Sequence, residues 1–295
     1  MNPILQQIRN GGWCGKINPE DYHALKGETV VSKSTLWEYM ASPYNFRQNQ
    51  LAGVKKESSG FAWGNLIDCL FLTPALLDSQ YVIEKKLSGA TKAGKEQAER
   101  ISMTGKQLLD PDVYMEAIKA ERLLREHVEM YGIERFETQI GMGMQVVIDI
   151  DGTPVSLSVL GLLDMRPEEL GVLRDLKTTR LDISNERALM YAITDFGYHV
   201  QAAMYLDLWN ILHPDDQRER FEFIFQESRP HYRVRTVELE PEAIQKGREA
   251  YNKALRQYAR SIALNDWPGA HLTIATLGLT YGEQAKDYTT EGGAA

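Results

Sequence analysis

The stretch SVLGLLDMRPEELGVLRDLKTT, from Ser158 to Thr179, decides the fold. Its apolar runs predict two strands, the first ending at Asp164 and the second running from Val172 to Lys177. Between them, the residues from Pro167 to Gly171 are those that turns prefer. The sequence therefore predicts two neighbouring strands that carry charged residues near the end of each.

Asp175 and Lys177 lie two positions apart on the second strand. Because side chains alternate across a strand, both point to the same face. Together with Asp164 on the neighbouring strand, they suit a site for Mg²⁺, which prefers carboxylate oxygens and keeps several waters. Lys177 could then orient or help deprotonate an attacking water. The alternative is a surface pair, since Asp-x-Lys arises by chance in chains of this length.

A third acidic residue interrupts an apolar helix. The run from Phe61 to Pro74 predicts a buried helix, in which Asp68 stands between Ile67 and Cys69. Aspartate is rarely buried unless it is paired or binds a metal. Asp68 is therefore a candidate metal ligand, and a salt bridge or a partly exposed position is the alternative.

Gln201 and Tyr205 belong to a predicted helix from Tyr198 to Leu212. Residues four apart share one face of a helix, so the two polar tips can reach the same site. A core position is the alternative for Tyr205, whereas a glutamine on an apolar face requires a hydrogen-bond partner.

The bulk properties narrow the class of protein. The 295 residues include 43% hydrophobic residues, enough for a sizeable core, and suit one large domain or two small ones. A net charge of −8 excludes a globally basic nucleic-acid binder but leaves room for a local basic patch. Two cysteines are too few for a Cys₄ zinc or iron–sulfur site. With no signal-peptide pattern and no apolar run of about 20 residues, we expect a cytoplasmic protein without a membrane span.

Two regions are candidates for contact with a nucleic-acid backbone. In the first, Ser34 is the expected N-cap of a helix that stops before Pro43, and Arg47 follows it. A helix N-terminus with hydroxyls suits a phosphate, although an ordinary cap is the alternative. The second region, 81–110, carries a basic cluster, for which a solvated helix face is the alternative. Its members are Lys85, Lys86, Lys92, Lys95, Arg100 and Lys106.

The remaining pattern predicts a mixed α/β (α+β) chain with a central sheet flanked by helices. Asp151-Gly152 predicts a hairpin between Arg135–Ile150 and Val155–Leu163. A further strand pair is expected over 220–226 and 232–239, with helices over 112–131, 184–194 and 240–265. We expect an irregular segment over 1–31, a single domain over 32–281 and a disordered tail over 282–295.

Four motifs occur in a fixed order: Gly64-x-x-x-Asp68, Gly161-Leu-Leu-Asp164, Asp175-x-Lys177-Thr-Thr and Gln201-x-x-x-Tyr205. This set resembles the P-D-(D/E)-x-K nuclease superfamily, and within it most of all the nuclease domain of exonuclease VIII (RecE). The Ser-Lys-Ser-Thr-Leu segment at 32–36 is similar to that family as well. The likeness spans about 32–267 and implies a restriction-endonuclease-like core.

The resemblance implies Mg²⁺- or Mn²⁺-dependent hydrolysis of duplex DNA from 5′ ends. Asp68, Asp164 and Asp175 would hold the metal, and Lys177 would position the water and stabilise charge on the phosphate. Gln201 and Tyr205 would line the site. It also implies that Ser34 and Arg47 contact the terminal phosphate, and that a ring-shaped homo-oligomer works beside a single-strand annealing recombinase, often in phages.

Two departures from the family pattern keep alternatives open. Asp68 stands where the family usually has His, although related lambda-type exonucleases carry a carboxylate there. Leu163 replaces the motif proline before Asp164. The alternatives are a RecB-like or structure-specific endonuclease on the same fold, an altered metal preference, or a catalytically silent module that binds DNA ends.

Overall fold

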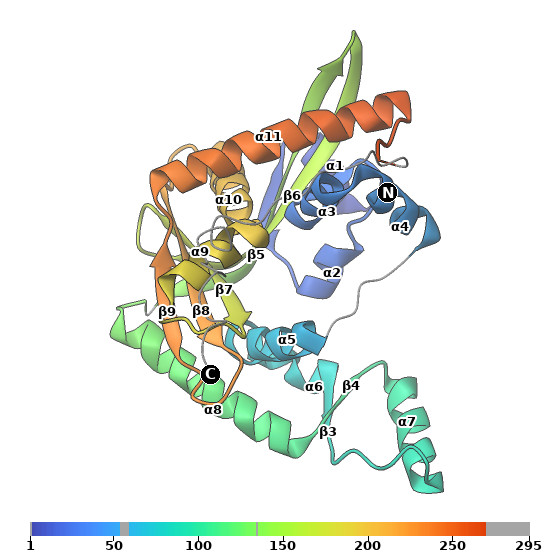
Figure 1. The fold of residues 1–295 in the computed structure, drawn as a ribbon, viewed down its shortest axis with the longest axis vertical. Coiled ribbons are helices and arrows are strands. Elements are labelled where there is room, and N and C mark those ends of the chain that lie inside the picture. The colour runs from blue at the N-terminus through green and yellow to red at the C-terminus, as the bar shows by residue number, and fades with distance from the viewer. Residues whose placement is uncertain (1, 54–58, 134, 270–295) are drawn as a thin grey trace, which may run out of the picture.

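The structure, a computed structural model, describes residues 2–53, 59–133 and 135–269 (Figure 1). Its centre is a seven-stranded mixed sheet in the order β1-β5-β6-β7-β8-β9, with β2 also paired to β6. The sheet strands are β1 (Trp13–Lys16), β2 (Val30–Ser32), β5 (Phe136–Ile150), β6 (Thr153–Pro167), β7 (Val172–Thr179), β8 (Arg220–Glu227) and β9 (Val234–Glu238). The expected central mixed sheet is confirmed.

Helices cover both faces of this sheet. On one face, α3 (Lys33–Ala41), α10 (Tyr198–Leu212) and α11 (Pro241–Leu264) bury a core that includes Leu173 and Phe223. On the other face, α5 (Ser59–Leu72) and α8 (Pro111–Met130) bury a second core that includes Leu176 and Ile224. The remaining helices are α1 (Pro3–Arg9), α2 (Pro19–Ala24), α4 (Pro43–Ala52), α6 (Leu77–Gln80), α7 (Lys92–Thr104) and α9 (Glu186–Asp195). The central strands of the sheet are thus covered on both sides, as their apolar residues require.

The β5–β6 hairpin is the longest feature of the sheet. Asp151 (φ 53°) and Gly152 (φ 87°) both have positive φ at its turn, which matches the twist of the flanking strands. The hairpin is confirmed, but the expectation that the first strand ends at Asp164 is wrong. Pairing with β5 continues to Phe136↔Pro167, so the strand stays hydrogen-bonded for three residues beyond Asp164.

The N-terminal segment also differs from its prediction. Residues 1–31 were expected to be irregular, yet they contain α1, β1, α2 and the start of β2. Asn2 and Asn18 cap the two short helices, each followed by proline in the first turn. The helices are too short for hydrophobic periodicity to identify them. The tail expected over 282–295 lies outside the described residues.

A small unit projects from the end of the molecule where α8 begins (Figure 1). It consists of β3 (Tyr81–Ile83) and β4 (Gln107–Leu109), paired in parallel, with α7 between them in sequence. It contains the basic cluster. None of the helices in the described part of the chain is long and apolar enough to cross a bilayer.

Candidate functional site

The motif residues of β6 and β7 meet at the centre of the sheet. The strands pair in antiparallel fashion at Met165↔Arg174, which places Asp164 directly opposite Asp175. Asp175 is almost fully buried, at 1% exposure, and forms an ion pair with Lys177 on the same face of β7. The sequence therefore correctly placed the carboxylates on adjoining strands, with the ammonium in direct contact with one of them.

Gln201 completes the surroundings of Asp175. Its Nε2 donates a hydrogen bond to Asp175 Oδ1 at 2.6 Å, while Lys177 contacts Oδ2. Gln201 is itself buried, so this bond supplies the partner that a buried amide needs. Both oxygens of Asp175 thus have partners, and its side chain is held in one orientation.

The pKa values of Asp68 and Asp164 are both raised in the site. Burial, followed by repulsion from Asp175 and Asp68, raises the pKa of Asp164 well above its usual value, although its Oδ2 accepts a hydrogen bond from Leu176 N at 3.1 Å. Burial and repulsion from Asp175, opposed by Lys177, together raise the pKa of Asp68 to about 7. Conversely, the pKa of Lys177 lies above its usual value because Asp175 and Asp164 together outweigh its burial. One ammonium therefore faces three carboxylates.

The three carboxylates fit a divalent cation by their chemistry. Carboxylate oxygens are hard donors, and a cation would relieve the repulsion that raises the pKa of Asp68 and Asp164. Across the described residues, however, no three His, Cys, Asp or Glu side chains already form a ligand set. Convergence of Asp68, Asp164 and Asp175 on one ion therefore stays a prediction.

Helix α5 reaches the site through a close contact with β7. A Cβ on Gly64 would lie 3.1 Å from Thr178 Oγ1, tighter than nearly all such contacts. Gly64 and Asp68 are four residues apart and share a helix face. The glycine therefore permits the approach that brings Asp68 into the field of Lys177.

Tyr205 contacts the backbone of β6, the strand that carries Asp164. Its hydroxyl accepts a hydrogen bond from Leu162 N at 3.4 Å, and its ring packs on Gly161, where a Cβ would lie 3.0 Å away. Burial, with smaller contributions from Tyr22, Asp175 and Asp164, raises the pKa of the hydroxyl well above its usual value. Gln201 thus contacts the site directly, whereas Tyr205 holds the strand that carries Asp164.

Sequence reasoning missed Lys33 and Tyr198. Lys33 donates a hydrogen bond to the carbonyl oxygen of Phe196 and lies 5.6 Å from the Tyr198 ring centroid. Lys177 lies 5.4 Å from the same centroid. Position 33 falls within the Ser-Lys-Ser segment that is similar to the family, and this likeness was the signal that could have identified Lys33. The prediction used only the hydroxyls of that segment.

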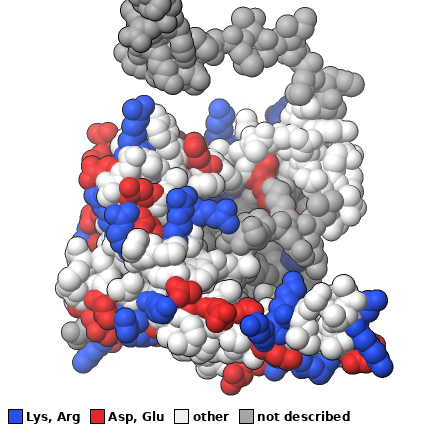
Figure 2. All heavy atoms as spheres, turned by 60° about the horizontal axis from the view of Figure 1, so that its bottom comes forward, with Lys and Arg blue, Asp and Glu red and all other residues white. Residues whose placement is uncertain are grey.

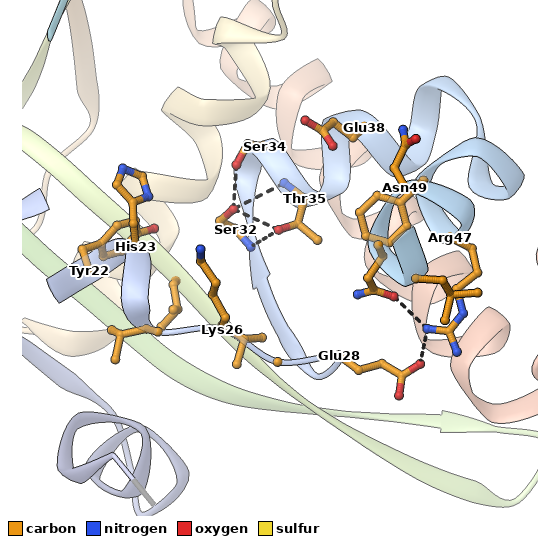
Figure 3. Close-up of a pocket in the computed structure, with 17 residues that line it drawn as sticks. Tyr22, His23, Lys26, Glu28, Ser32, Ser34, Thr35, Glu38, Arg47 and Asn49 are labelled. Atoms are coloured by element: carbon orange, nitrogen blue, oxygen red, sulfur yellow. Dashed lines mark hydrogen bonds and ion pairs between the residues drawn. The ribbon is translucent and has the colours of Figure 1, made fainter. Parts of the chain in front are cut away.

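The N-terminal end of α3 borders a cavity of about 720 Å³ (Figure 3). Both Ser34 and Arg47 line it, so the structure brings this predicted pair to one place. The N-cap is Ser32 rather than Ser34, because Ser32 and Thr35 form a reciprocal capping box. Arg47 is already engaged, at 2.7 Å from both Glu28 Oε1 and Gln50 Oε1.

Lys85, Lys86 and Lys92 lie on the projecting unit and are exposed. Lys92 is 3.7 Å from Glu96, and the nearby Arg100 pairs with Glu84. Figure 2, which turns this end of the molecule forward, shows acidic and basic side chains interspersed on this face. Contact of these lysines with DNA stays a prediction.

The chain was compared with known proteins. The family described as "PDDEXK-like domain of unknown function (DUF3799)" matches residues 32–273. A solved structure described as "Putative exonuclease" from Eubacterium rectale is 13% identical with a TM-score of 0.55, covering 92% of this chain and 98% of that chain. A phage related exonuclease from Haemophilus somnus 129PT is 14% identical with a TM-score of 0.30, covering 68% of this chain and 95% of that chain. A comparison with curated protein sequences finds no match.

At 13% identity, the likeness to the Eubacterium rectale structure shows a shared fold. The family match establishes more than a shared fold, because it spans most of the chain and includes every motif residue from Asp68 to Tyr205. The chain belongs to the PDDEXK-like family, and with it to the P-D-(D/E)-x-K nuclease superfamily that its motifs resemble.

Proposed function

We propose that this protein is a metal-dependent deoxyribonuclease that degrades linear duplex DNA from 5′ ends and leaves 3′ single-stranded overhangs for recombination. The observation that carries the proposal is the set of Asp164, Asp175, Lys177 and Gln201 on adjoining strands and helix α10, in which Asp175 and Gln201 are buried. Membership in a nuclease superfamily supports hydrolysis of a phosphodiester.

Mg²⁺ or Mn²⁺, held by Asp68, Asp164 and Asp175, would lower the pKa of bound water and stabilise the oxygens of an in-line displacement. The Lys177 ammonium, oriented by Asp175, would stabilise the negative charge that develops on the attacked phosphate. Gln201 would keep Asp175 in place through its 2.6 Å hydrogen bond. Water adds to the phosphorus, the bond to the 3′ oxygen breaks, and that oxygen takes up a proton.

The 5′ polarity rests on the cavity beside α3. Ser34 and Arg47 line it, and Leu160 in its wall lies four residues before Asp164 on β6. A terminal phosphate bound there would place the first linkage toward the carboxylates. Each hydrolysis leaves a new 5′ phosphate on the shortened strand, so the same cavity would accept every successive end.

Three further parts of the proposal rest on resemblance. They are assembly into a ring-shaped homo-oligomer, cooperation with a single-strand annealing recombinase, and action in the cytoplasm of a bacterium or phage-infected host. A ring would keep the enzyme on DNA between steps.

The test is nucleotide release by purified protein with Mg²⁺, from linear duplexes bearing either a 5′ phosphate or a 5′ hydroxyl, and from a closed circle. We expect mononucleotides from the phosphorylated duplex, slower release from the hydroxyl end and an intact circle. Lys177→Met should be inactive, while Lys246→Met, on the exposed side of α11, should match wild type. Cleavage of the circle would favour a RecB-like endonuclease, and binding without cleavage would favour a silent DNA-end module.

A further inference from the structure

Lys33 is a cation that the fold surrounds with neutral groups. It is the first residue of α3, and its side chain is partly buried. The ammonium donates to the carbonyl oxygen of Phe196 and lies 5.5 Å from the Trp37 centroid and 5.6 Å from that of Tyr198. Aromatic faces and a carbonyl stabilise a cation without cancelling its charge.

Lys177 is the informative contrast. Both ammonium groups lie against the Tyr198 ring, at 5.4 Å for Lys177 and 5.6 Å for Lys33. Lys177 forms an ion pair with Asp175, whereas no carboxylate in the described part of the chain lies within salt-bridge distance of Lys33. Within the described residues, Lys33 therefore has no carboxylate partner that would neutralise its charge, and it is free to attract an anion.

Lys33 is close enough to the centre for its charge to matter there. Burial and repulsion from Lys177, opposed by Asp175, together lower its pKa to about 8. The same helix end presents Ser32 and Ser34 to the cavity of Figure 3. The first turn of α3 therefore carries both Lys33 and a hydroxyl that lines the cavity.

We propose that Lys33 is a second cationic ligand of the scissile phosphate, which it would bind from the α3 side while Lys177 approaches from β7. This inference rests on the proposed function, since it takes the attacked phosphate to lie at the carboxylate centre. Lys177 would act mainly as the bond breaks, and Lys33 would hold the phosphate in both the ground state and the transition state. Loss of Lys33 should therefore raise KM more than it lowers kcat.

The experiment measures binding rather than cleavage, so that it stands apart from the test of nuclease activity. The probe is a fluorescent 5′-phosphorylated duplex, titrated with protein in Ca²⁺ over a range of salt concentrations. Wild type, Lys33→Met, Lys33→Arg and Lys246→Met are compared. Two further duplexes carry one uncharged methylphosphonate, either at the first linkage or at the tenth.

We expect Lys33→Met to bind the duplex about tenfold more weakly. The slope of log affinity against log salt concentration (the salt slope) should fall by about one, as loss of one phosphate contact does. Lys33→Arg should keep the slope, and Lys246→Met should match wild type. A methylphosphonate at the first linkage should weaken wild type but not Lys33→Met, whereas one at the tenth should affect both equally.

Additive losses for Lys33→Met and the first methylphosphonate would overturn the proposal, as would an unchanged salt slope or an absence of DNA binding by wild type. Should Lys33→Met fail to fold, as judged by thermal melting, Lys33→Gln replaces it, with Lys33→Arg as the variant that keeps the charge. A wild type that binds DNA with the expected Lys33 dependence but never cleaves it would refute the nuclease activity and keep Lys33 as a phosphate ligand.

Discussion

The carboxylate centre and the projecting β3–α7 unit both carry charged residues, but their surroundings differ. In the centre, Asp175 is 1% exposed, and both of its oxygens have partners from separate elements. In the projecting unit, the side chain of Lys92 is 92% exposed and forms an ion pair with Glu96, a neighbour on the same helix. The fold holds the charged groups of the carboxylate centre in position, whereas the exposed lysine ammonium groups of the projecting unit move with their flexible side chains.

The largest effect should come from breaking the fixed region. Asp175→Asn keeps the shape of the side chain but removes the charge that pairs with Lys177 and would bind the metal. We expect at least about a thousandfold loss of kcat in single-turnover cleavage. Asp195→Asn, an exposed change on α9, is the control. Retention of one tenth of the activity would show that Asp175 is not part of the reacting centre.

In the metal-free centre, Asp68 should make the stability of the protein depend on pH. Its folded pKa of about 7 lies above its ordinary value of 3.8, so the folded state binds the proton more tightly. Stability from this group is present below pH 4 and lost as pH rises through 7. Asp68→Asn has no carboxyl group at this position and does not suffer that loss. The free energy of unfolding of Asp68→Asn minus that of wild type should therefore increase by about 2 kcal/mol between pH 5 and pH 8.

The measurement is urea unfolding in EDTA at both pH values. Asp112→Asn, an exposed change in the first turn of α8, serves as the control. A difference between Asp68→Asn and wild type that is the same at pH 5 and pH 8 would mean that the carboxyl titrates as in the unfolded chain.

The contrast between the regions also explains what could be predicted from sequence. Asp164, Asp175 and Gln201 lie on regular elements, where period-2 or period-3.6 spacing decides the face of each side chain. The antiparallel pairing then places Asp164 opposite Asp175 with little freedom. Their proximity was therefore predictable, although the partner of each atom was not.

Other features depend on contacts between distant segments, which spacing does not encode. Lys33 meets the carbonyl of Phe196, 163 positions away, and no local pattern indicates that contact. The short helices α1 and α2 were missed because a segment of six or seven residues shows no period. Ser32 was passed over as the cap since Ser34 offers the same chemistry two positions later.

Gly64 tests whether the close packing of α5 is what joins Asp68 to the centre. In Gly64→Ala the added Cβ would lie 3.1 Å from Thr178 Oγ1, so α5 or Thr178 must shift by a few tenths of an ångström. We expect a stability loss of about 1 kcal/mol and roughly a tenfold loss of cleavage, because such overpacking moves Asp68 from its place. Gly89→Ala, where no atom lies within 4 Å, is the matched control. Unchanged cleavage with reduced stability would separate the packing of α5 from the chemistry.

The smallest effect should come from the flexible region. The triple variant Lys85→Met, Lys86→Met, Lys92→Met removes three exposed charges, which would contact DNA only through its backbone. We expect duplex binding to weaken about fivefold at 50 mM salt and by less than twofold at 200 mM, because salt screens exposed charges. The value of kcat should be unchanged, since none of these lysines contacts a carboxylate of the centre. The triple variant Lys246→Met, Lys253→Met, Arg256→Met on α11 removes the same number of exposed charges and controls for net charge. Equal weakening there would show that the projecting unit contributes only to the overall field of the protein. A loss of kcat in the triple variant of the projecting unit would instead mean that this unit moves against the centre during turnover, and the distinction between fixed and flexible charge would fail.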